Sequence, residues 1–160
     1  MSVRGYLLSS VLRSDGPGNS EFPPHTLVPA MRDAYPNLLL AEEDNLLAEI
    51  IAFRLELLGY KVARVKSGQE LLERMADDLP DLMIVDLFLP DMDGFDLINQ
   101  LSSESRTDRV PILVFSTDSE LESVERAHAA GADDFLVVPF DPTVMEYKVE
   151  QLLERAVGGK

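Results

Sequence analysis

The sequence predicts an α/β domain: a five-stranded parallel sheet with helices on both faces. From Asn37 onward, short apolar runs alternate five times with segments of helical periodicity. The segments between successive runs are long enough to hold helices, so the strands that they connect are expected to be parallel. Helices cover both faces of a sheet of this kind, and its strands are therefore buried.

The expected elements follow one another without an internal repeat. The strands are placed at residues 38–41, 61–65, 82–85, 111–115 and 135–138. The helices are placed near residues 46–58, 67–75, 94–101, 119–130 and 142–155.

The first two strand–helix units have clear local signals. Leu38–Ala41 is wholly apolar, and Gly59 ends the helical pattern that follows it. The apolar positions of that helix are Leu46, Leu47, Ile50, Ile51, Leu55 and Leu58. Lys61–Val65 is the second strand, and Ser67 with Glu70 three residues later forms a capping box that opens the second helix.

The last three units are marked in a similar way. Leu82–Val85 and Pro111–Phe115 are apolar strands, and the helix after the second of these ends at Gly131. The last helix opens with Asp141 as its N-cap and Pro142 at its first position, where both residue types are favoured.

Composition narrows the class of protein. The 160 residues contain no cysteine, which excludes disulfides and cysteine catalysis and suits a reducing cytoplasm. The net charge of −15 disfavours direct binding to nucleic acid, because the protein would repel the phosphate groups. No apolar run approaches the ~20 residues that cross a membrane, and the N-terminus has no signal-peptide pattern. We therefore expect a cytoplasmic protein that contacts neither nucleic acid nor membrane.

Residues 1–36 differ in composition from the rest of the chain. They contain Gly16–Gly18 and a series of prolines, which is typical of a linker or a loosely ordered arm. Residues 3–12 fit either a short amphipathic helix or a strand. The expected division is an arm over residues 1–36, one domain over residues 37–157 and a tail over residues 158–160.

Acidic and hydroxyl side chains follow three of the expected strands. Glu42 and Glu43 come after the first strand, Asp86 after the third and Ser116 after the fourth. Open parallel sheets bind ligands at the carboxyl ends of their strands, so these residues are expected to meet at one edge. Mg²⁺ would neutralise the clustered carboxylates, and it accepts a partial shell of protein oxygens. The pattern indicates that Asp86 is both metal ligand and nucleophile, and that the Ser116 hydroxyl faces a phosphoryl oxygen.

Four segments carry a family resemblance in their order and spacing. They are residues 39–45, 80–94, 110–116 and 129–135. Together they resemble the receiver domain of bacterial two-component response regulators, over residues 37–156. The resemblance implies the flavodoxin-like (βα)5 fold and a role in phosphorelay signal transduction.

The resemblance also implies a role for each residue of the acidic site. Asp86 matches the phosphoacceptor. Glu42 and Glu43 match the acidic pair that holds Mg²⁺ together with Asp86, and the backbone carbonyl of Phe88 matches a further ligand. Ser116 matches the hydroxyl residue that contacts the phosphoryl group.

Two further positions complete the comparison, and three residues depart from the family pattern. Phe135 matches an aromatic switch position, and the bond before Pro139 matches one that is typically cis. Val138 stands where the family has a lysine that binds the phosphoryl group, which makes this an atypical receiver. Glu43 replaces the usual aspartate, which weakens the expected affinity for Mg²⁺, and Phe135 lacks the hydroxyl of the common tyrosine.

The function implied by the resemblance is signalling, not enzymatic turnover. Asp86 is expected to receive a phosphoryl group from a histidine kinase or a phosphotransfer protein. The face formed by the last two helices and the fifth strand is then expected to contact a partner protein or a second copy. The departures at Val138 and Glu43 favour a close alternative, a pseudo-receiver that docks or dimerises without phosphorylation.

A more distant alternative is a phosphatase with an aspartate nucleophile. Residues 91–96 resemble the Asp-x-Asp-Gly motif of such enzymes, and also part of a calcium loop. Pro90 precedes the segment where the phosphatase motif needs a buried strand, and the calcium loop would need a glycine at its sixth position. The simpler interpretation is that Asp93 caps a helix.

Overall fold

The computed structural model describes residues 35–157, and residues 1–34 and 158–160 lie outside that description. The chain divides into two units between Pro36 and Asn37, and the second unit holds every element described below. The predicted arm, including residues 3–12, thus lies outside the described residues except for its last two. Its role stays a prediction.

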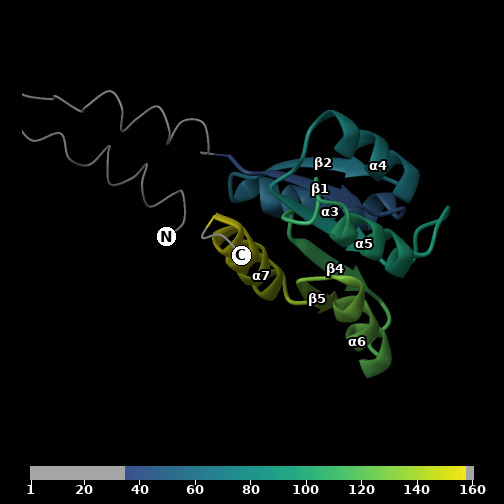
Figure 1. The fold of residues 1–160 in the computed structure, drawn as a ribbon. Helices are drawn as coiled ribbons and strands as arrows, with labels where there is room; N and C mark the ends of the chain where they lie inside the picture. Colours follow the sequence, from purple (N-terminus) through teal and green to yellow (C-terminus); the bar gives the residue numbers. More distant parts are fainter. Residues whose placement is uncertain (1–34, 158–160) are drawn as a thin grey trace, which may run out of the picture. The chain divides into compact units, whose positions relative to one another are not determined.

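A five-stranded parallel sheet forms the centre of the domain (Figure 1). Its strands are β1 (Asn37–Ala41), β2 (Lys61–Val65), β3 (Leu82–Asp86), β4 (Ile112–Ser116) and β5 (Asp134–Val137). They lie in the order β2-β1-β3-β4-β5, and every neighbouring pair is parallel. This arrangement confirms the predicted fold class.

Five helices cover the two faces of this sheet (Figure 1). They are α3 (Asn45–Leu57), α4 (Gly68–Asp77), α5 (Gly94–Ser103), α6 (Leu121–Ala130) and α7 (Pro142–Val157). Helices α3 and α7 share an apolar core on one face, and α4, α5 and α6 share a second core on the other. Among the described residues, no helix is both long and apolar enough to span a membrane.

Successive residues of a strand supply these two cores in turn. Leu38 and Leu40 of β1 face α3 and α7, whereas Leu39 and Ala41 face the other side, as the two-residue period of a strand requires. All four are buried. Each fully buried leucine stabilises the fold by roughly 1.5–3 kcal/mol, so the central strands give the residues at their ends a rigid support.

The helix ends follow most of the predicted signals. Ser67 accepts a hydrogen bond from the Glu70 N–H at 3.1 Å, and the Glu70 carboxylate accepts the Lys66 N–H at 2.9 Å. Helix α6 begins later than predicted, at Leu121. The Asp118 carboxylate accepts the Glu120 N–H at 2.9 Å, so the chain first makes a turn there.

Candidate functional site

The C-terminal edge of the sheet brings three predicted site residues together. Glu42 directly follows β1, Asp86 is the last residue of β3, and Ser116 is the last residue of β4. These three strands are neighbours in the sheet, and their registers place the three residues at the same edge. This is the edge at which parallel sheets bind ligands.

Asp86 is half-buried, and the backbone that follows it holds its carboxyl group. Its Oδ1 accepts a hydrogen bond from the Phe88 N–H at 3.1 Å, and the Leu87 N–H also donates to the carboxylate. Burial raises the pKa of the Asp86 carboxyl, while the hydrogen bonds from Phe88, Leu87 and Glu42 oppose that increase. The group is therefore oriented by the protein while part of it still reaches solvent.

Glu42 is a buried acid beside Asp86, with 5% of its surface exposed. Its backbone N–H donates to the Val65 carbonyl at 3.0 Å, and its Oε1 accepts the Asp44 N–H at 2.7 Å. Burial is the main cause that raises the pKa of the Glu42 carboxyl to about 7. The hydrogen bond from Asp44 opposes this increase, whereas the negative charges of Asp86 and Asp44 add to it. A hydrogen bond also joins the side chains of Glu42 and Asp86.

The two consecutive glutamates contribute differently to the site. Glu43 is exposed, and its charge helps to raise the pKa of Asp86. Within residues 35–157, no group of three acidic or histidine side chains is arranged to hold a metal by itself. The oxygen donors of Glu42 and Asp86 nevertheless suit Mg²⁺, which takes oxygen ligands and usually keeps several waters.

Ser116 places a hydroxyl group at the end of the neighbouring strand. The residue is buried, and its Oγ accepts a hydrogen bond from the Asp118 N–H at 3.1 Å. A serine hydroxyl can donate one hydrogen bond while it accepts another, so the Ser116 O–H is suited to a phosphoryl oxygen. Its backbone carbonyl accepts the Val138 N–H at 2.8 Å, which keeps the end of β5 beside β4.

The position at which the family resemblance predicts a lysine makes an apolar contact. Val138 is half-buried and packs against the core that α3 and α7 cover. The peptide bond between Val138 and Pro139 is cis. Phe135 is buried in the core on the opposite face of the sheet. Position 138 therefore contributes packing, and no charge, to this edge of the sheet.

Comparison with known proteins identifies the family to which this site belongs. Residues 38–150 match the family model of the response regulator receiver domain. The chain belongs to this family. A solved receiver-like structure, a putative response regulator from Chloroflexus aurantiacus J-10-fl, is 33% identical with a TM-score of 0.73, and the match covers 76% of this chain and 99% of that one. The chemotaxis response regulator CheY4 of Vibrio cholerae has a TM-score of 0.70 at 24% identity over 74% of this chain and 98% of that one, which supports the fold alone.

The curated relatives are longer proteins that contain a receiver domain. The phosphate regulon regulatory protein PhoB of Rhizobium meliloti is 32% identical, and the response regulator PhoP of Pseudomonas aeruginosa is 36% identical. Each match covers 76% of this chain and 53% of the relative, so the chain spans about half the length of these relatives. RpaA of Synechocystis, described as DNA-binding, is 31% identical over 75% of this chain and 50% of its own length. The predicted lack of nucleic-acid binding is therefore unsupported.

The structure shows a role of Asp91 that sequence reasoning missed. Asp91 lies in the loop after β3, and its two carboxylate oxygens accept the N–H groups of Gly68 and Gln69, both at 2.9 Å. These bonds lower the pKa of Asp91 and attach the loop after β3 to the first turn of α4. No local pattern reveals this contact, because the partners are more than twenty residues apart in the sequence.

The segment that resembled a phosphatase motif has a structural role. Asp93 is the N-cap of α5, and its Oδ1 accepts the N–H groups of Phe95 at 2.8 Å and Asp96 at 3.2 Å. The simpler of the two sequence interpretations is confirmed. The motif therefore gives no support to an aspartate-nucleophile phosphatase.

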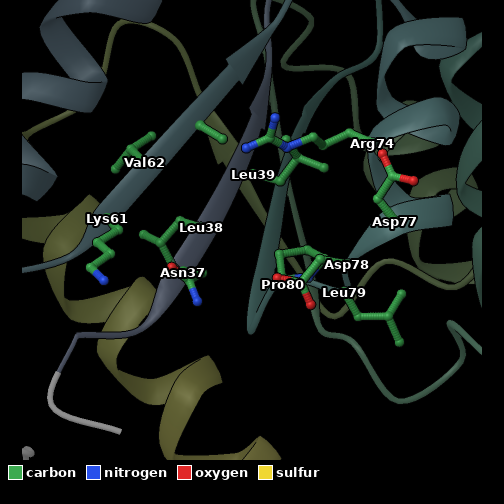
Figure 2. Close-up of a pocket in the computed structure, with 11 residues that line it drawn as sticks. Asn37, Leu38, Leu39, Lys61, Val62, Arg74, Asp77, Asp78, Leu79 and Pro80 are labelled. Atoms are coloured by element: carbon green, nitrogen blue, oxygen red, sulfur yellow. The ribbon is translucent and has the colours of Figure 1, made fainter. Parts of the chain in front are cut away.

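A pocket of about 440 Å³ lies at the other end of the sheet (Figure 2). The first residues of β1 and β2 and the end of α4 line it, and its charged side chains include Lys61, Arg74 and Asp77. Glu42 follows the carboxyl end of β1 and Asp86 lies at the carboxyl end of β3, whereas the pocket lies at the amino ends of β1 and β2. The pocket is therefore separate from the receiver's acidic site.

Proposed function

We propose that Asp86 accepts a phosphoryl group from a histidine kinase or a phosphotransfer protein, and that the chain signals through protein contacts. The observation that carries this proposal is the position of the Asp86 carboxyl group. It lies half-buried at the end of β3, two backbone N–H groups hold it, and the buried acid Glu42 lies beside it. A carboxylate that is oriented but still accessible is suited to act as a nucleophile.

The transfer follows from the residues at this edge of the sheet. A carboxylate oxygen of Asp86 attacks the phosphorus of a phosphohistidine; an O–P bond forms, the P–N bond breaks, and the histidine nitrogen leaves. Glu42, Glu43, Asp86 and the Phe88 carbonyl would hold Mg²⁺, which would neutralise charge on the phosphoryl oxygens. The Ser116 hydroxyl donates a hydrogen bond to one of these oxygens.

The output face of the domain consists of β5, α6 and α7. Leu121, Val137 and Tyr147 are exposed apolar or aromatic side chains on these elements. Phe135 lies in β5 beneath this face and is the switch residue that couples it to the acidic site. A partner protein, or a second copy, binds the face when Asp86 is phosphorylated. The absence of cysteine from the sequence suits a cytoplasmic location for this exchange.

A second candidate function is docking or dimerisation without phosphorylation. The packing of Val138 into the α3–α7 core favours it, because the site then has no cation there to stabilise a phosphoryl group. The exposed Glu43 favours it as well, since a longer side chain than aspartate fits the strict octahedral shell of Mg²⁺ less well.

Intact-protein mass spectrometry distinguishes the two functions. The full chain is incubated with Mg²⁺ and a small acyl phosphate, alongside Asp86→Asn and Asp93→Asn. We expect one added phosphoryl group in the parent and in Asp93→Asn, whose asparagine still caps α5, and none in Asp86→Asn. An unlabelled parent, under conditions that label an ordinary receiver domain, would contradict the proposal and favour the phosphorylation-independent function instead.

A further inference from the structure

Helix α3 presents an apolar stripe to solvent. The stripe consists of Leu46, Ile50, Phe53 and Leu57, each between 56% and 68% exposed. The buried residues of the same helix are Ala48, Ile51, Ala52 and Leu55. At 3.6 residues per turn these two sets lie on opposite sides of the helix. A helix that is apolar on both sides is typical of one that is covered on both sides.

The spacing of the stripe indicates what covers it. Successive members are four, three and four residues apart, which is the heptad spacing of a helix that packs along another helix. In this register Ile50 and Leu57 take the a positions, and Leu46 and Phe53 take the d positions. Ile50 at one a position and Leu46 at one d position match the combination of a β-branched residue at a with leucine at d, which favours a pair of parallel helices.

The charges beside the stripe favour a second copy of the same helix. Glu49 and Glu56 lie at g positions, and Arg54 lies at an e position of the same heptads. In a parallel pair, Glu49 of one copy faces Arg54 of the other, twice by symmetry. In an antiparallel pair, Glu49 would face Glu56, and the two would repel.

Arg54 retains N–H donors that can bind Glu49 of a second copy. Its Nε donates to the Glu146 carboxylate of α7, and its side chain is 45% exposed. A guanidinium group carries five N–H donors, so its terminal nitrogens remain to meet a carboxylate on a neighbouring molecule. The bond to Glu146 also limits the rotation of the Arg54 side chain, which reduces the entropy lost on binding.

We propose that α3 pairs with α3 of a second copy of this chain, in a parallel dimer with two-fold symmetry. This interface is distinct from the β5–α6–α7 output face and does not depend on phosphorylation. Helix α3 begins directly after the acidic residues that follow β1, so the parallel pairing places both Asp86 sites at the same end of the dimer.

Sedimentation equilibrium of the full chain, up to millimolar concentration, tests the dimer. We expect a monomer–dimer equilibrium whose dissociation constant rises about tenfold or more in Phe53→Glu. Asn99→Glu is the matched control, because Asn99 is exposed on α5, which belongs to neither proposed interface, and the change adds the same charge. The control should leave the equilibrium unchanged, and circular dichroism should report the same fold for all three. A chain that stays monomeric, or a dimer that Phe53→Glu leaves intact, would overturn the proposal.

Disulfide cross-linking tests the orientation without interference, because the chain has no native cysteine. Leu57→Cys should form a disulfide-linked dimer under mild oxidation, since the two copies of this position face each other only in the parallel pair. Glu73→Cys, on the exposed surface of α4, is the control and should stay monomeric. Cross-linking between Leu46→Cys and Leu57→Cys chains, with no homodimer of either, would show an antiparallel pair and overturn the proposed geometry.

Discussion

Glu42 and Asp86 share a hydrogen bond between their carboxyl groups at the ends of adjacent strands. Burial raises the pKa of both groups, and that of Glu42 reaches about 7. At neutral pH the pair therefore retains part of a proton, which offsets some of the negative charge at this edge. Val138 brings no positive charge to this edge, so a metal ion that bound the two carboxyl groups would compete with protons for them.

This competition predicts that Mg²⁺ binds more tightly as the pH rises. Glu42 must lose its proton before both of its oxygens are available to a metal. With a pKa of about 7, we expect the apparent affinity for Mg²⁺ to increase about tenfold between pH 6 and pH 8. Calorimetric titration in two buffers of different ionisation enthalpy would measure the affinity and the proton released. An affinity independent of pH would contradict the assignment of Glu42 as a ligand.

The same pair predicts the pH dependence of stability in the absence of metal. The pKa of Glu42 is raised from 4.5 in the unfolded chain to about 7 in the folded one. The stability that protonated Glu42 contributes to the fold is therefore fully present below pH 4.5 and is lost as the pH rises through 7. The loss is at most about 3–4 kcal/mol, since one pKa unit corresponds to roughly 1.4 kcal/mol. Urea denaturation across this range should show the decline.

The variant Glu42→Gln tests whether Glu42 causes this decline of stability with rising pH. A glutamine can keep a hydrogen bond to Asp86 but does not titrate, so the stability of the variant should fall less between pH 4.5 and pH 7. The variant should also gain stability relative to the parent at pH 8, where the parent holds two charged carboxylates close together. A slope equal to that of the parent would assign the pH dependence to other groups.

The location of the acidic site could be predicted because it follows from topology. Once five apolar runs define a parallel sheet, the residues after the first, third and fourth runs must come to one edge. The different roles of Glu42 and Glu43 could not be predicted. Consecutive residues at a strand end point in different directions, and only the packed structure decides which carboxyl group is buried.

Helix α3 also shows what a helical pattern of apolar residues cannot predict from the sequence. Its apolar positions identify a helix correctly, but two of them, Leu46 and Ile50, are exposed in the structure. Because leucine, isoleucine or phenylalanine occurs around the whole circumference, periodicity alone does not decide which side faces the sheet. The contact from Asp91 to α4 could not be predicted either, since it joins a loop to the start of a helix that is distant in the sequence.

Gly94 is predicted to tolerate no side chain. A Cβ atom at this position would lie 2.6 Å from the Leu87 Cα and from the Leu87 carbonyl oxygen, both of which belong to the backbone after Asp86. Gly94→Ala must move that backbone, and we expect it to lower the free energy of unfolding by about 2–3 kcal/mol. Urea denaturation measures the change. Because the shift occurs beside Asp86, labelling by an acyl phosphate should fall as well.

Gly68→Ala is the matched control for this prediction. The three atoms nearest to a Cβ atom there all belong to the flexible side chain of Met92, which can change rotamer. We expect a loss of less than about 1 kcal/mol, with labelling at Asp86 retained. Equal losses in the two variants would show that contact with the Leu87 backbone is not the cause.

Val138→Lys is predicted to strengthen the phosphorylated state. A lysine can lay its apolar stem along the α3–α7 core and extend its ammonium group toward the carboxyl groups at the strand ends. A hydrogen bond to a charged group contributes roughly 1.5–3 kcal/mol, so binding of a fluoroberyllate mimic of the phosphoryl group should tighten about tenfold or more. Fluorescence or calorimetric titration in the presence of Mg²⁺ would measure this.

Val138→Met provides a stem of similar length without the charge, and separates packing from electrostatics. The methionine variant should bind the mimic as the parent does. The lysine variant should also lower the pKa of Glu42, because a nearby cation favours the carboxylate. Its stability should consequently decline less between pH 4.5 and pH 7 than that of the methionine variant. If the two variants bind the mimic equally and share one pH profile, the ammonium group does not reach Asp86, and the end of β5 is arranged for packing alone.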